Sequence, residues 1–129
     1  MDDNPADVRL VRAALEEHRI IGELTVVRDG EKAIQFIEDI ENGLRPCPDM
    51  MIVDLNLPKR PGRDVLECRN RSGKLRNVPV IVLSSSDAAR DRDDSARLGA
   101  SLYVQKPSRL DDFLGLGATF RQMLGFPVW

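Results

Sequence analysis

The chain is 129 residues long and carries 19 lysines and arginines against 21 aspartates and glutamates, which gives a formal net charge of −2. A chain of this length builds one domain around a single core, and its charge balance supplies no basic surface for nucleic acid or an anionic membrane. No apolar run approaches the roughly 20 residues that cross a bilayer, and the acidic start, Met-Asp-Asp-Asn-Pro, is unlike a secretory signal.

Apolar periodicity and turn residues predict alternating helices and strands in the first half of the chain. Asn4 is placed to cap a helix whose first turn holds Pro5, a residue that is well tolerated there. The expected elements are a helix over residues 5–19, a strand over 24–27, a turn at Asp29-Gly30, a helix over 33–40 and a loop over 42–48.

A short apolar run, Met50 to Val53, follows this loop and ends at Asp54. It is too short for a helix and has turn residues close behind it, which is typical of a strand buried on both faces. Pro58 stops regular structure soon afterwards. A single aspartate at the end of a strand is more often a turn residue than a reactive group, so its meaning depends on the rest of the chain.

The second half of the chain continues this alternation. Its expected elements are a turn over 58–62, a helix over 63–70, a strand over 78–83, a helix over 88–98 that Gly99 ends, a strand over 102–105 and a helix over 110–124. Strands and helices that alternate at this spacing indicate an α/β domain with a parallel sheet, joined by right-handed crossovers.

Polar groups recur at the chain start and where these strands end. They are Asp2, Asp3, Asp54, Ser84 and Lys106, the last of which is followed by Pro107. Taken alone, each has an ordinary explanation as a partner of a helix dipole, a capping residue or a solvated turn. Because the carboxyl ends of parallel strands share one edge of a sheet, all of them can converge there. Together they favour a single functional site.

The residue types predict the chemistry of that site. Carboxylates held close together repel one another unless a cation lies between them, and Mg²⁺ prefers such oxygen ligands. The ion would neutralise charge on a transferring phosphoryl group, which a lysine and a serine hydroxyl could also bind. A carboxylate that attacks phosphorus forms an aspartyl-phosphate.

The chain resembles the response regulator receiver domains of two-component signalling over nearly its whole length. The matching residues are the acidic pair Asp2-Asp3, Asp54 within Ile-Val-Asp-Leu-Asn-Leu-Pro, Ser84 after Val-Ile-Val-Leu, Tyr103, and Lys106-Pro107. The resemblance implies a phosphoacceptor switch that takes its phosphoryl group from a sensor histidine kinase and uses Mg²⁺. It implies no enzyme activity beyond self-catalysed phosphoryl transfer and slow autodephosphorylation.

The same resemblance assigns a phosphoacceptor and a metal site. Asp54 is implied to accept the phosphoryl group. Asp3 is implied to bind Mg²⁺ directly, together with Asp54 and the backbone carbonyl of Asn56, while Asp2 acts through a water molecule. Asn56 and Ser86 occupy positions that tune dephosphorylation in the family.

The resemblance also assigns the groups that hold and report the phosphoryl group. Ser84 and Lys106 are implied to bind it, and Tyr103 is implied to reorient with Ser84 and so report its presence. The peptide bond between Lys106 and Pro107 is expected to be cis, as functional prolines can be.

The implied fold is a flavodoxin-like, doubly wound parallel sheet, which is five-stranded in the family. A receiver normally has an apolar strand just before the acidic pair, and this sequence has only Met1 there. The first strand is therefore expected to be missing or truncated, which leaves two neighbours without a backbone partner. The alternatives are a truncated or misassigned start, which we favour, a strand supplied by another molecule, or a rearranged sheet.

A narrower likeness is to the single-domain regulators that partner bacterial phytochrome kinases. It rests on Asn-Pro-Ala-Asp-Val-Arg-Leu-Val at the front, on Leu-Pro-Lys-Arg-Pro-Gly-Arg-Asp-Val-Leu after Asn56, and on the long loop over 42–48. It implies one receiver domain over residues 1–129 with no output domain, and a homodimer through the C-terminal half. Dimerisation and local packing are equally open roles for Phe120, Phe126, Val128 and Trp129.

Two rival functions compete with the phosphorylated switch. The first is a receiver-fold binding module that is never phosphorylated. The second is a phosphatase-like hydrolase, which would want a second acid two residues beyond the nucleophile, where this chain has Asn56. Because no output domain is expected, we expect signalling by protein–protein contact, with neither nucleic acid nor membrane as a partner.

The remaining sulfur and imidazole groups predict no metal site. Cys47 and Cys68 lack a metal-ligand spacing and fit free thiols in a reducing cytoplasm. His18 is expected on a helix surface.

Overall fold

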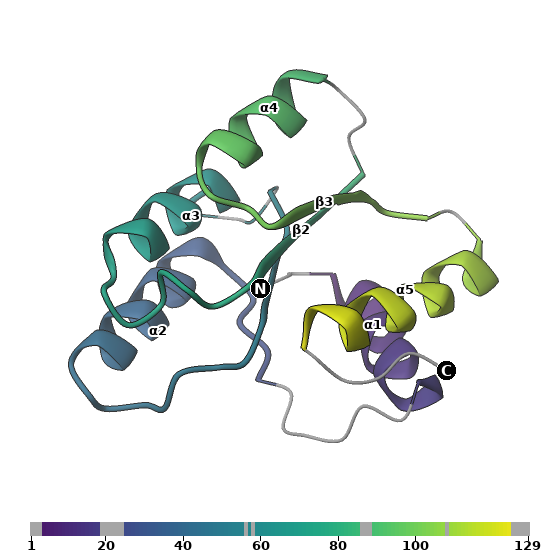
Figure 1. Ribbon diagram of the computed structural model, residues 1–129, viewed down its shortest axis with the longest axis horizontal. Helices are drawn as coiled ribbons and strands as arrows, with labels where there is room; N and C mark the ends of the chain where they lie inside the picture. The colour runs from purple at the N-terminus through teal and green to yellow at the C-terminus, as the bar shows by residue number, and fades with distance from the viewer. Residues whose placement is uncertain are drawn as a thin grey trace.

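The computed structural model describes residues 4–18, 25–55, 57, 59–85, 89–107 and 109–124. Within these ranges helices and strands alternate from residue 30 onwards, as expected (Figure 1). The elements are α1 (Pro5–Glu17), α2 (Gly30–Glu41), β1 (Met51–Val53), α3 (Gly62–Arg71), β2 (Val80–Ser84), α4 (Ala89–Arg97), β3 (Leu102–Gln105) and α5 (Leu110–Met123). Among them, no helix is both long and apolar enough to cross a bilayer.

The described strands form one parallel sheet in the order β1-β2-β3. Val53 of β1 pairs with Val82 of β2, and Ser84 of β2 pairs with Gln105 of β3. The predicted parallel sheet is confirmed, and β3 covers the residues expected for it. All three strands end at the same edge.

Successive residues of β2 point to opposite faces of the sheet, and every one of them is buried. Val80 and Val82 belong to the core that also contains apolar residues of α2 and α3. Ile81 and Leu83 belong to the core that contains residues of α1 and α5. Figure 1 shows the same arrangement, with α1 beside α5 and α2 beside α3. The sheet is doubly wound, which explains why this strand has a continuous apolar run rather than an alternating one.

Side chains cap two of the helices at their N-termini. The Oδ1 atom of Asn4 accepts a hydrogen bond from the backbone N–H of Ala6 at 2.9 Å, and that of Asp29 accepts one from Lys32 at 2.8 Å. Asp29 therefore starts α2 directly, whereas the sequence predicted a separate turn. At the other end of a helix, Gly99 follows α4 with a φ of 87°, a left-handed conformation that favours glycine.

Residues 25–28 lie outside any strand, so the strand predicted over 24–27 is wrong for the part of it that is described. Leu24 falls outside the described residues. A strand forms only where a neighbour pairs with its backbone groups. In the flavodoxin-like order that neighbour is the first strand, which is not among the described strands. The described sheet has three strands, against five in the family.

Helices α1 and α5 approach closely around His18, which is half-buried between them. Its Nε2 lies 3.1 Å from the carbonyl oxygen of Leu114, and its own carbonyl accepts a hydrogen bond from Arg121 at 2.5 Å. A Cβ at Gly117 would lie 2.5 Å from the backbone carbonyl oxygen of Ala14 and 2.1 Å from the His18 ring, so a glycine is needed at this contact. The expectation that His18 lies on a helix surface is wrong, because α5 covers it.

Phe120 is buried within the same contact, with 1% of its surface exposed. It packs in the core with residues of α1 and the sheet. Local packing, rather than dimerisation, is therefore its role. Phe126, Val128 and Trp129 lie outside the described residues.

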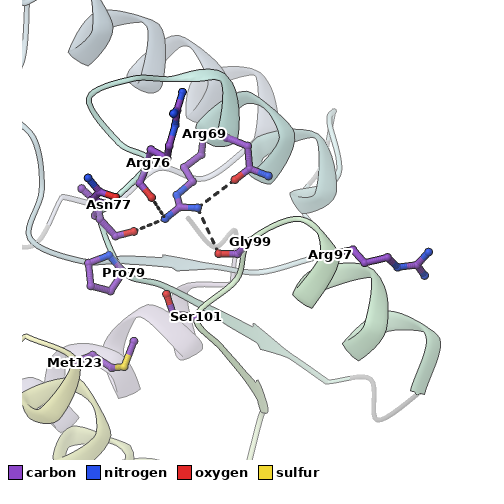
Figure 2. A pocket seen from close by; sticks show the side chains of 10 residues that line it. Arg69, Arg76, Asn77, Pro79, Arg97, Gly99, Ser101 and Met123 are labelled. Carbon is purple, nitrogen blue, oxygen red and sulfur yellow. Dashed lines mark hydrogen bonds between the residues drawn. The ribbon is translucent and has the colours of Figure 1, made fainter.

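Arg69 ties together the backbone at the amino-terminal edge of the sheet. Its guanidinium donates hydrogen bonds to the carbonyl oxygens of Arg76, Val78 and Gly99 at 3.0, 2.6 and 3.3 Å (Figure 2). Only 5% of Arg69 is exposed, and this burial lowers the pKa of the guanidinium. The residue serves as a structural tie between the end of α3 and the starts of β2 and β3.

A pocket lies beside this tie, at the opposite edge of the sheet from Asp54. Figure 2 shows that the guanidinium groups of Arg76 and Arg97 point away from that of Arg69. The three cations therefore do not converge on one anion. The predicted functional residues lie elsewhere.

Candidate functional site

Asp54 directly follows β1 and is buried, with 4% of its surface exposed. Gly62, the first residue of α3, packs against the backbone at this point. Its N–H donates a hydrogen bond to the carbonyl of Leu55 at 2.9 Å, and a Cβ on it would lie 2.3 Å from the carbonyl oxygen of Asp54. Only a glycine allows this approach, so the start of α3 fixes the backbone that carries Asp54.

The parallel register brings Ser84 and Lys106 to the same edge as Asp54. Ser84 is the last residue of β2 and is fully buried. Its carbonyl oxygen accepts a hydrogen bond from the backbone N–H of Lys106 at 2.6 Å. Because Val53 pairs with Val82, Asp54 lies beside the end of β2. Three of the residues singled out in the sequence thus meet at one edge.

The ammonium group of Lys106 lies between two carboxylates. Its Nζ donates to Oδ2 of Asp54 at 2.7 Å and to Oδ2 of Asp7 at 2.5 Å. The side chains of Lys106, Asp7 and Asp54 are only 16%, 13% and 5% exposed. Charges that water reaches so little interact more strongly than exposed pairs do.

Asp7 is the residue of this site that sequence reasoning missed. An acidic residue in the first turn of a helix is fully explained by the helix dipole, and Asp7 lies in the first turn of α1. The sequence feature that could have identified Asp7 is its position one turn after the cap Asn4, in a helix that begins near the acidic pair. That position puts Asp7 at the carboxyl edge of the sheet.

Tyr103 connects this edge to α4. It lies in β3 opposite Val82, is half-buried and packs against the core beside α2 and α3. The guanidinium carbon of Arg92, on α4, lies 4.8 Å from the centre of its ring. A cation at this distance over an aromatic face is attracted by the ring quadrupole, so the ring of Tyr103 is held between the core and α4.

The Lys106–Pro107 peptide bond is trans, because no cis bond occurs among the described residues. The expected cis bond is therefore wrong. Trans is the lower-energy isomer of an X–Pro bond by about 0.5–1 kcal/mol, and with the bond in this isomer Lys106 already reaches both carboxylates.

Four of the predicted site residues lie outside the described part of the chain, namely Asp2, Asp3, Asn56 and Ser86. Within the described part, no group of three or more histidine, cysteine, aspartate or glutamate side chains could hold a metal. What the described part does supply are the carboxylate oxygens of Asp54 and Asp7, a donor type that fits Mg²⁺.

The site combines a nucleophile with a group that can bind an anion. The carboxylate of Asp54 can act as a nucleophile at the edge where ligands of parallel sheets bind. Lys106 offers an ammonium that can bind a negatively charged oxygen placed beside that carboxylate. Together they suit the formation and holding of an aspartyl-phosphate.

The sequence and the fold were compared with known proteins. A family model described as "Response regulator receiver domain" matches residues 1–116. The chain is 36% identical over 115 residues to Response regulator Rcp1 of Synechocystis sp. (strain ATCC 27184 / PCC 6803 / Kazusa), a match that covers 87% of this chain and 77% of the relative.

Two solved structures resemble the fold closely. The phosphorylated cyanobacterial phytochrome response regulator RcpA superposes with a TM-score of 0.86 and 32% identity, over 96% of this chain and 89% of that one. The Mn²⁺-bound form of Rcp1 gives a TM-score of 0.84 and 33% identity, over 95% and 88%. These proteins share both the fold and a third of the sequence with this chain.

Proposed function

The chain belongs to the response regulator receiver domain family, and we propose that it is a phosphoryl-accepting switch with Asp54 as the phosphoacceptor. The observation that carries this proposal is the pairing of a buried Asp54 with Lys106, at 2.7 Å, where β1, β2 and β3 end. The phosphorylated state of the relative RcpA supports the same chemistry.

In the proposed reaction an oxygen of the Asp54 carboxylate attacks the phosphorus of a kinase phosphohistidine. A phosphorus–oxygen bond forms, the phosphorus–nitrogen bond breaks, and the imidazole of the kinase leaves. Lys106 binds a phosphoryl oxygen, and the hydroxyl of Ser84 donates a hydrogen bond to another. Both groups stabilise charge on the phosphoryl oxygens, which is where catalysis of such transfers acts.

We propose that Mg²⁺ is held by Asp3, Asp54 and the backbone carbonyl of Asn56, with Asp2 acting through water. When bound, the ion would supply positive charge to the transferring phosphoryl group. The solved Mn²⁺-bound form of the relative Rcp1 supports the binding of a divalent cation.

The readout is proposed to run from Ser84 through Tyr103 to α4. A new charge on Asp54 draws the Ser84 hydroxyl toward it and changes the space open to the Tyr103 ring. Because Arg92 lies over that ring, the change reaches the surface of α4. This is a two-state equilibrium biased by a local charge. The family positions at Asn56 and Ser86 are proposed to tune how long the phosphoryl group stays.

The proposed donor is a sensor histidine kinase of the phytochrome type. Structures named as phytochrome or bacteriophytochrome response regulators, RcpA and RtBRR among them, share this fold at 32% identity. The two free cysteines, Cys47 and Cys68, support a reducing cytoplasm as the place of the exchange. Signalling onward is proposed to use protein–protein contact.

The test is the intact mass of the protein after incubation with acetyl phosphate and Mg²⁺. We expect a gain of one phosphoryl group in the wild type and no gain in Asp54→Asn or in the presence of a chelator. A folded wild-type protein that gains no mass would refute the proposal and leave an unphosphorylated binding module as the better description.

A further inference from the structure

Asp7 forms an ion pair with Lys106 beside Asp54. The lysine extends from the end of β3 and meets a carboxylate of α1 on one side and Asp54 on the other, at 2.5 and 2.7 Å. Asp7 is 13% exposed in its side chain, so water screens this contact little. A helix dipole alone would not require Asp7 to touch a lysine at the end of the sheet.

A phosphoryl group on Asp54 would change what Lys106 has to bind. The ammonium has three hydrogen-bond donors and one positive charge. Forming the aspartyl-phosphate removes the carboxylate charge of Asp54 and places close to two negative charges on the phosphoryl oxygens, so the negative charge beside Lys106 and Asp7 rises by about one. Asp7 would then compete with the phosphoryl group for Lys106, and its own charge would repel the phosphoryl oxygens.

We propose that Asp7 is a positioning residue that holds the Lys106 ammonium beside Asp54 and, by competing for it, limits how tightly a phosphoryl group is held there. This inference rests on the proposed function of Asp54. It gives the chain a built-in bias toward the unphosphorylated state, set by one carboxylate on α1.

The pair itself is tested without phosphorylation, by a double-mutant cycle in urea unfolding. Asp7→Asn keeps the shape of the side chain and removes its charge, and Lys106→Met removes the ammonium. We expect the two substitutions to be coupled, so that Asp7→Asn shifts the unfolding midpoint differently with and without Lys106. Equal shifts in both backgrounds would overturn the pairing of Asp7 with Lys106.

Competition is tested with beryllium fluoride, a phosphoryl analogue, titrated at saturating Mg²⁺ and followed by the ¹⁹F signal of the bound species. We expect Asp7→Asn to bind the analogue about three- to fivefold more tightly, the range typical of one charge interaction of modest exposure. Asp7→Glu keeps the charge and is expected to return the affinity toward that of the wild type. A merely structural role for Asp7 would not give tighter binding.

Two controls separate competition from a general charge effect. Glu16→Gln removes an exposed carboxylate from the same helix, and we expect it to bind the analogue as the wild type does. In the Lys106→Met background the effect of Asp7→Asn is expected to shrink. An effect of full size in that background, or an equal effect of Glu16→Gln, would overturn the inference.

Different experimental results would refute this inference and the proposed function. If the wild type binds no analogue and gains no phosphoryl group, the function of Asp54 is refuted, whatever the unfolding cycle shows. If the wild type binds the analogue and Asp7→Asn binds it no more tightly, Asp54 keeps its proposed role and the inference about Asp7 is wrong.

Discussion

Gly62 lies where α3 meets the backbone that carries Asp54. A Cβ on it would lie 2.3 Å from the Asp54 carbonyl oxygen and 2.7 Å from Cα of Leu55. Both neighbours are backbone atoms, which cannot rotate away as the end of a side chain can. The proposed phosphoacceptor therefore depends on a residue that carries no chemistry of its own.

We predict that Gly62→Ala lowers the free energy of unfolding by about 1–3 kcal/mol, the usual cost of forcing extra atoms into a packed site. We also expect slower phosphorylation by acetyl phosphate, because the added methyl group pushes α3 away from Asp54. Urea unfolding and intact mass against time measure the two effects.

The matched control for that substitution is Gly115→Ala in α5. Nothing lies within 4 Å of a Cβ at Gly115, and alanine is favoured over glycine in a helix by about 1 kcal/mol. We expect this variant to be at least as stable as the wild type and to react as fast. A Gly62→Ala protein that matched it in both measurements would contradict the close approach of α3.

At the scale of elements, a carboxylate joins the ends of α2 and α3. Glu41, the last residue of α2, accepts a hydrogen bond from the hydroxyl of Ser72 at 2.5 Å. This bond is the main cause of a lowered pKa for Glu41. Desolvation, the second-largest effect, opposes it, and the nearby backbone N–H and ammonium of Lys74 lower the pKa further. The connection therefore depends on pH.

The sign of that dependence follows from the direction of the pKa shift. A carboxyl group whose pKa is lower in the folded state than in the unfolded one adds stability above the unfolded value, about 4.3 for glutamate. That stability is lost as the pH falls through the lower, folded value. Compared with the wild type, Glu41→Gln is expected to be less stable at pH 7, with the difference shrinking as the pH falls below about 4.

Urea unfolding of both proteins from pH 7 to pH 3.5 measures this difference. Glu17→Gln is the control, since Glu17 is an exposed glutamate at the end of another helix, α1. A gap between the wild type and Glu41→Gln that stayed constant with pH would contradict the role of the Ser72 bond.

The elements also show what a sequence can predict. Local signals placed the start of α1 at Asn4 and the end of α4 near Gly99, because a capping side chain and a left-handed glycine act within a few residues. The strand expected over 24–27 failed because a strand forms only where another strand pairs with its backbone, which the apolar pattern of the segment itself does not reveal. The expected surface position of His18 failed because the helix that covers it lies about 100 residues further along the chain.

The residues of the site likewise divide into those that the local sequence predicts and those that depend on distant packing. Asp54, Ser84 and Lys106 could be predicted because each follows an apolar strand and parallel strands share an edge. The contact of Asp7 with Lys106 could not, because it depends on how α1 packs beside the sheet, although the position of Asp7 near the start of that helix was visible in the sequence. The isomer of the bond at Pro107 could not either, since the sequence around it permits both forms.

At the scale of the whole molecule, two layers of helices meet at one polar edge. Helices α1 and α5 cover one face of the sheet, while α2 and α3 cover the other. Asp7 comes from the first layer, Asp54, Ser84 and Lys106 come from the ends of the strands, and Arg92 on α4 contacts Tyr103 from β3. A charge added at Asp54 is therefore next to groups from several elements, which is what a switch needs if a local event is to change a distant surface.

A ligand that binds this edge only in the folded protein must stabilise the whole molecule. For Mg²⁺ the gain in unfolding free energy is about 2.7 kcal/mol when the ion is present at 100 times its dissociation constant. We predict that Mg²⁺ raises the thermal unfolding midpoint by several degrees and that a chelator reverses this rise. The readout is the difference with and without the ion, at matched ionic strength.

Asp54→Asn is the decisive comparison for this last prediction. It removes a carboxylate at the proposed metal site and also leaves Lys106 with one charged partner fewer, so the variant's own midpoint differs from that of the wild type. The shift that Mg²⁺ causes is the quantity to compare, because it isolates binding from that change. We expect the shift to be much smaller in Asp54→Asn. An equal shift in both proteins would mean that the ion binds elsewhere and would remove Asp54 from the metal site.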